Sequence, residues 1–214
     1  MREWTRGQPL EESVEIWRGE PGDVVAAGSA YWDKGHQYKV WYRAQTFYDT
    51  THFASDPDAP DTMVKVDIPS DFSFNMFADQ VVIHCKSEWA PSAGHEFKAG
   101  SVVSHPTDAF LRGERSEFTV LYSPADDRCA YAGSSETKDY MMVHTLEHMV
   151  TRVYVWRFDA ETKAFSFVKA HVAENCQSFS ASGVDSERSN ELFVTTDGFL
   201  DPVALSTATA PDLE

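Results

Sequence analysis

Short runs of Val, Ile, Phe, Tyr, Trp and Thr recur along the whole chain, and turn-forming residues separate them. The clearest run, 150–158, alternates between apolar and polar residues as a strand between two faces does. Runs of this kind predict strands at 13–17, 23–27, 38–47, 63–68, 80–86, 101–104, 118–123, 139–144, 150–158, 164–168, 178–181, 191–196 and 203–206. Strands at intervals of about 8–12 residues are typical of a sandwich, barrel or propeller, so the predicted fold class is all-β.

The segments between these runs predict little helix. Residues 108–113 begin with Asp and end with Gly, which is enough for one helical turn. Residues 54–61 form a polar, proline-bearing loop, and residues 87–100 are expected to form a long hairpin tip. The tail after Ala204 is expected to end without a closing element. Strands do not alternate with amphipathic helices, which argues against a parallel α/β sheet.

Charge and composition narrow the classes of partner. The 214 residues fit one domain, and 34 acidic against 18 basic residues give a formal charge of −16. A surface of that sign repels nucleic acid and anionic lipid, so neither is an expected partner. No apolar run approaches the roughly 20 residues that span a bilayer, and the first residues are polar, unlike a secretory signal. If the chain is complete, we expect a cytoplasmic protein.

Cysteine spacing and acidic loops give no metal or cofactor site. Cys85, Cys129 and Cys176 are far apart in the sequence and form no CxxC pair, so we expect free thiols in a reducing compartment. Cys85 lies in an apolar run and is expected to be buried. The acidic pair Asp126-Asp127 and the run 56–61 lack the pattern of an EF-hand, and solvated loops are the expected structure. We therefore expect the chain to bind no cofactor and no metal.

One motif points to a different chemistry. Residues His144 to His148 read HxxEH, which on a helix would place both imidazoles on one face to hold zinc, with Glu147 as the base. A zinc metallopeptidase through residues 144–148 is therefore an alternative. The β-branched and aromatic residues that follow favour a strand instead. We expect a hairpin, with 140–144 as one strand, Leu146 and Glu147 at the turn, and 148–158 as the second strand.

Several segments, in order along the chain, resemble the propeller of prolyl oligopeptidase-family serine peptidases. Residues 66–71 (VDIPSD) are similar to that family's DVPDDA, and 97–102 (FKAGSV) to its YPAGSLL. Residues 108–113 (DAFLRG) are similar to DAFLAG, and 189–200 (SNELFVTTDGFL) to ESNEYFLTVTDFL. Residues 32–37 and 137–142 match the family less well than their surroundings do. The order of these matches makes a chance likeness improbable.

The resemblance implies that residues 1–214 are one domain, a partial β-propeller of about three to four four-stranded antiparallel blades. The parent protein would be a serine-type endopeptidase that cleaves peptides after proline, and the propeller would gate access to an α/β-hydrolase domain. That domain needs a GxSxG elbow, which this chain lacks. We therefore expect no catalytic residue here, and no peptidase activity from the isolated chain.

Expected partners are a peptide substrate and the hydrolase domain in the parent enzyme. Self-association is also expected, because the open ends of a partial propeller would expose apolar blade faces. A stand-alone, non-catalytic binding or scaffold domain is a further alternative function.

Overall fold

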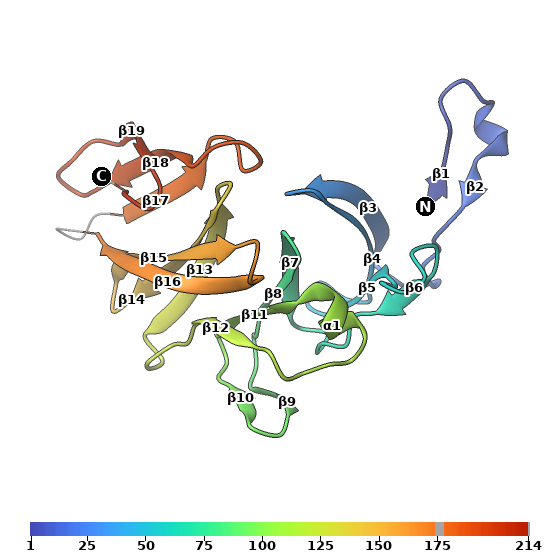
Figure 1. Ribbon diagram of the computed structural model, residues 1–214, viewed down its shortest axis with the longest axis horizontal. Helices are drawn as coiled ribbons and strands as arrows, with labels where there is room; N and C mark the ends of the chain where they lie inside the picture. The colour runs from blue at the N-terminus through green and yellow to red at the C-terminus, as the bar shows by residue number, and fades with distance from the viewer. Residues whose placement is uncertain (174–177, 214) are drawn as a thin grey trace.

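The computed structural model describes residues 1–173 and 178–213. Four antiparallel sheets follow one another in chain order around an arc (Figure 1). The first sheet holds β3 (Val25–Asp33), β4 (His36–Ala44), β5 (Thr50–Ser55) and β6 (Met63–Lys65). The second holds β7 (Ser73–Phe77), β8 (Gln80–His84), β11 (Val102–Pro106) and β12 (Thr119–Tyr122). These sheets are blades of a partial propeller.

The third and fourth sheets continue the arc. The third holds β13 (Cys129–Glu136), β14 (Tyr140–Glu147), β15 (Val150–Asp159) and β16 (Ala164–Val172). The fourth holds β17 (Ser178–Gly183), β18 (Glu191–Asp197) and β19 (Ala204–Thr209), three strands in the described part of the chain. Three sheets of four strands and one of three confirm the expected all-β fold of three to four blades.

Smaller elements lie outside the four sheets. Strands β1 (Arg2–Glu3) and β2 (Val14–Glu15), with the 3₁₀ turn Leu10–Glu12, form an arm beside the first sheet (Figure 1). The hairpin of β9 (Trp89–Ser92) and β10 (His95–Phe97) lies between β8 and β11, as expected for 87–100. Helix α1 (Thr107–Leu111) provides the expected single turn. None of the described helices is long and apolar enough to cross a membrane.

Three hydrophobic cores separate the four sheets, because each inner sheet is buried on both faces. In β8, Val81 and Ile83 point into the core shared with the first sheet, whereas Val82 points into the core shared with the third. In β14, Val143 faces the second sheet and Met142 faces the fourth. Successive side chains of a strand point to opposite faces, which explains this division.

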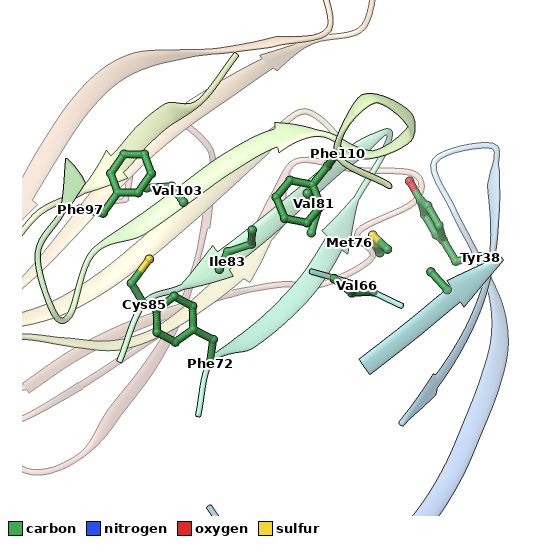
Figure 2. Close-up of a cluster of buried hydrophobic side chains, with 11 residues drawn as sticks. Tyr38, Val66, Phe72, Met76, Val81, Ile83, Cys85, Phe97, Val103 and Phe110 are labelled. Carbon is green, nitrogen blue, oxygen red and sulfur yellow. The ribbon is translucent and has the colours of Figure 1, made fainter. Parts of the chain in front are cut away.

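The core between the first two sheets is the one shown in Figure 2. Phe72 lies beside the sulfur of Cys85, the residue that follows β8, and Phe110 lies beside Val81 on β8. Tyr38 contributes to this core from the first sheet. Cys85 is fully buried there, as expected, and burial raises the pKa of its thiol to about 12. This thiol is a packing group. Cys129 is also a free, buried cysteine, and Cys176 lies outside the described residues.

Some expectations about single elements were wrong. The tail after Ala204 does not fade: it begins β19, which pairs with β18 along its whole length. The expected strand at 13–17 is reduced to Val14–Glu15 and belongs to the arm rather than to a blade. Strands β5, β7 and β13 had not been predicted, because polar or small residues occupy many of their positions.

Candidate functional site

The HxxEH segment forms a β-hairpin. Strand β14 runs to Glu147, His148 and Met149 form the turn, and β15 starts at Val150. His148 and Met149 have φ values of 50° and 67°, the left-handed conformation that two-residue hairpin turns require. The expectation of a hairpin is confirmed, but the turn lies two residues later than predicted, because β14 keeps pairing with β15 through Glu147.

This geometry excludes the zinc-peptidase arrangement. His144 pairs with Val153 in mid-strand, so His144 and His148 are separated by four strand residues, or about 13 Å. Glu147 is already engaged: its carboxylate accepts a 2.6 Å hydrogen bond from the Tyr154 hydroxyl and lies 3.1 Å from Arg152 Nε. The two histidines cannot hold one metal ion, and the alternative based on residues 144–148 is wrong.

A serine and a histidine do meet, at the interface of the third and fourth sheets. Ser135 Oγ lies 2.9 Å from His144 Nε2 and donates a 2.6 Å hydrogen bond to the carbonyl oxygen of Ala181. Because the hydroxyl proton goes to the carbonyl, His144 must donate its own Nε2 proton to Ser135. Burial also lowers the pKa of His144, which keeps it neutral. A general base would have to accept the serine proton, so this pair connects two sheets and does not form a nucleophile.

A hollow lies where hairpin ends of all four sheets meet, and we call it the hairpin cleft. It has a volume of about 740 Å³. The β3–β4, β7–β8, β13–β14 and β15–β16 connections and the segment after β17 contribute to it. Both signs of charge line it: the cations are Lys34, Lys138, Arg157 and Lys163, and the anions are Asp79, Asp139, Asp159, Glu161 and Glu187. The cleft can therefore receive a ligand that carries both charges.

Lys34 is the most buried cation of the hairpin cleft. Its Nζ lies 3.0 Å from Asp33 Oδ1, 3.5 Å from Glu136 Oε2 and 4.1 Å from the centre of the Phe77 ring. The Lys34 backbone N–H donates to both carboxylate oxygens of Glu187, at 3.1 Å each. One residue thus contacts groups from the first, second, third and fourth sheets.

Glu136 is the carboxylate whose ionisation is least favoured here. Burial raises its pKa, and the nearby charge of Lys34 offsets only part of that effect. At 3.5 Å the contact to Lys34 is too long for a strong hydrogen bond, and Glu136 Oε2 is buried without a hydrogen-bond partner among the described residues. Glu136 therefore gains its proton at a higher pH than an exposed glutamate does.

Asn190 joins the fourth sheet to the β13–β14 turn, whose Asp139 lines the cleft. Its Oδ1 accepts hydrogen bonds from the Thr137 hydroxyl and the Asp139 backbone N–H, each 3.0 Å, and its Nδ2 donates to Asp139 Oδ2 at 2.8 Å. The backbone N–H of Lys138 donates to the carbonyl of Ser189 at 3.0 Å. These bonds hold the β13–β14 turn against the fourth sheet.

No motif or spacing in the sequence singles out Asp33, Lys34, Glu136 or Asn190. The one available signal was the resemblance itself, because 32–37 and 137–142 matched the family less well than their surroundings. Both segments lie at the hairpin cleft.

Comparison with known proteins shows which structures share this fold. No family model matches the chain. A curated relative, the uncharacterized peptidase y4nA of Sinorhizobium fredii, is 30% identical over 210 residues, which are 96% of this chain and 28% of that protein. The solved post-proline cleaving enzyme of Rickettsia typhi superposes with a TM-score of 0.81 over 96% of this chain and 30% of its own, at 19% identity. The chain therefore has the fold of the propeller segment found in this post-proline cleaving enzyme.

A more distant structure supports the same fold. Oligopeptidase B of Trypanosoma brucei, solved with covalently bound antipain, has a TM-score of 0.63 at 12% identity and covers 100% of this chain and 29% of its own. The chain thus spans less than a third of the length of these proteins. Its fold is established by these likenesses, and the activity of the relatives lies beyond what they show for this chain.

Proposed function

We propose that this chain is the propeller portion of a prolyl oligopeptidase-like serine-type endopeptidase and that it gates peptide access to an α/β-hydrolase domain on the rest of the protein. The observation that carries the proposal is the hairpin cleft, where hairpin ends of four blades meet around charges of both signs. A peptide has a cationic and an anionic terminus and polar backbone groups, so it suits such a lining better than an apolar ligand does.

The two segments that match the family less well than their surroundings lie at the hairpin cleft, and this position supports a role in selecting substrates. Residues 34–36 and 138–139, which belong to segments 32–37 and 137–142, line the hairpin cleft. These two segments resemble the family less well than their surroundings do. Variation at the rim of a rigid scaffold changes what binds without changing the fold. The chain would then contribute access and selection, and the nucleophile would come from the other domain.

The test uses the full-length protein that contains this segment. Lys138 and Arg157 are exposed at the cleft, so Lys138→Glu and Arg157→Glu should leave the fold intact while reversing local charge. We expect each to change kcat/KM for charged proline-containing peptides about 3- to 10-fold, in opposite directions for acidic and basic peptides. Reaction with a small serine-directed phosphonate should stay unchanged. Lys65→Glu, on β6 and outside the cleft, is the matched control.

Two results would contradict the proposal. The first is cleavage of folded proteins at the rate measured for short peptides, because a gate must discriminate by size. The second is a set of cleft variants indistinguishable from Lys65→Glu for every peptide. A complete gene product without a hydrolase domain would favour the scaffold alternative.

A further inference from the structure

Three residues of different chemistry meet at the end of the third sheet, away from the hairpin cleft. Asp126 precedes β13, Cys129 is the first residue of β13, and His148 forms the β14–β15 turn. His148 Nε2 lies 3.0 Å from Asp126 Oδ2, and Cys129 Sγ lies 3.4 Å from Asp126 Oδ1. One ligand atom from each residue lies within 4.8 Å of the other two.

These separations suit a zinc ion. Zinc bonds of about 2.0–2.3 Å in a tetrahedron put neighbouring ligand atoms roughly 3.3–3.7 Å apart, so small side-chain rotations would complete the geometry. Thiolate, imidazole and carboxylate are all zinc ligands, and their mixture disfavours magnesium and calcium. The Asp126 and His148 side chains are 40% and 48% exposed, so an ion can enter from solvent. Cys129 is buried behind them.

A separate observation points to a missing group beside this cluster. The Tyr122 side chain is buried to 6% exposure, and its hydroxyl has no hydrogen-bond partner among the described residues. The Tyr122 ring packs against that of Tyr154, with centroids 5.7 Å apart. The Tyr154 hydroxyl donates to Glu147, which pairs with Cys129 across β13 and β14, so Tyr122 lies on the side of the sheet end that holds the cluster. A buried hydroxyl without a partner costs about 1–3 kcal/mol, and a metal-bound water would satisfy it.

We propose that Asp126, Cys129 and His148 form a zinc-binding site, with water as the fourth ligand beside Tyr122. The ion would join the loop before β13 to the β14–β15 turn, and so fix one end of the third sheet. This site shares only His148 with the HxxEH motif. It differs from the sequence-based expectation that the chain holds no metal.

The experiment uses cobalt as a spectroscopic probe on the purified chain, because a cobalt–thiolate bond absorbs in the near ultraviolet and tetrahedral cobalt absorbs in the visible. We expect one equivalent of Co²⁺ to produce both bands, and Zn²⁺ to displace it and raise Tm. Cys129→Ser should abolish the near-ultraviolet band. His148→Asn should weaken binding at least 10-fold while preserving the turn, since Asn accepts the left-handed conformation.

The matched controls separate a metal site from a general effect on the hairpin. Met149→Asn changes the other left-handed residue of the same turn, and Cys85→Ser removes the other buried cysteine in the described chain. Both should bind cobalt like the wild type. The proposal is overturned if the wild type binds weaker than about 100 µM, if the bands persist in Cys129→Ser, or if His148→Asn and Met149→Asn behave alike. Because His148 lies at an exposed turn, its variant remains informative even if Cys129→Ser fails to fold.

Discussion

The backbone N–H of Ala78 donates a 2.6 Å hydrogen bond to Asp33 Oδ2, from a position 45 residues later in the chain. Asp33 ends β3 in the first sheet, and Ala78 lies in the β7–β8 turn of the second. Ala78 has a φ of 51°, which an alanine adopts at a cost, and this bond helps to hold it there. Asp33 also pairs with Lys34, so one buried carboxylate joins two sheets beside the hairpin cleft.

Replacement of Asp33 should therefore destabilise the chain far more than loss of a surface ion pair. Asp33→Ala leaves the Ala78 N–H and the Lys34 ammonium short of a partner, and we expect a loss of about 2–4 kcal/mol in the free energy of unfolding. Urea unfolding measures it. The control is Asp58→Ala, which removes the exposed partner of Arg112 and should cost less than about 1 kcal/mol. Equal losses would show that Asp33 does not join the sheets.

Asn190 should be the corresponding residue between the third and fourth sheets. Asn190→Ala removes the three side-chain bonds to Thr137 and Asp139, and we expect a loss of about 1–3 kcal/mol. Hydrogen exchange should show faster opening of β17 and β18 than of β7 and β8. Asn75→Ala, at an exposed position of β7, serves as the control and should change neither quantity. Uniformly faster exchange over all four sheets would contradict a local role.

These residues show what the sequence could not indicate. The apolar runs of β8 and β14 predict strands because both faces of these strands are buried, and the alternation in β15 predicts a strand that has one buried face. Strand β13 contains Gly133 and two serines, and only pairing with β14 makes it a strand. The Asp33–Ala78 bond depends on how two sheets meet, which no local pattern records.

The hairpin turn shows a second limit. His148 and Met149 are not the Asn-Gly type that marks a two-residue turn, so the turn was placed two residues early. Because the turn falls at His148 and Met149, the imidazole of His148 lies next to the carboxylate of Asp126. His148, which the sequence places in the HxxEH motif, thus lies in the structure with Asp126 and Cys129.

Acid should destabilise the chain through its buried histidines. Burial lowers the pKa of His52, His84, His105 and His144 below the ordinary 6.5. The unfolded chain then takes up protons before the folded chain does, so the stability from the neutral forms is complete above pH 6.5 and is lost as the pH falls toward the folded-state values. We expect the free energy of unfolding to fall between pH 7 and pH 5.

His144→Gln tests this at one position. Glutamine can still donate to Ser135 but does not titrate, so its pH dependence should be shallower than that of the wild type. Asn75→Ala, which removes no titratable group, is the comparison and should match the wild-type slope. Identical slopes for the wild type and His144→Gln would rule out His144 as a contributor.

The contribution of Glu136 to stability should change with pH in the opposite direction. Its pKa is raised in the folded state, so the stability of its neutral form is present below its unfolded value of 4.5 and is lost as the pH rises through the folded value. Glu136→Gln should thus be as stable as the wild type or modestly more stable at pH 7, and the difference should vanish at pH 4. Lower stability of the variant at pH 7 would mean that the ion pair with Lys34 outweighs burial.

The outer face of the fourth sheet should make the isolated chain self-associate. Leu192 and Val194 point into the core, so Phe193 between them points outward and is 43% exposed, and Leu205 on β19 is 68% exposed. Phe193 pairs with Thr207, two residues from Leu205 on the same face of β19. Apolar faces of this kind seldom stay bare on soluble monomers.

We expect the isolated chain to bind hydrophobic dyes and to form oligomers at micromolar concentration, measured by light scattering after size exclusion. Added salt should increase association, because it screens the repulsion between chains that each carry a formal charge of −16. The double variant Phe193→Ser, Leu205→Ser should reduce both signals. Met149→Ser, which removes an exposed apolar residue from the β14–β15 turn instead, should leave them unchanged. A monomer that binds no dye at any salt concentration would show that this face is covered by another part of the same chain.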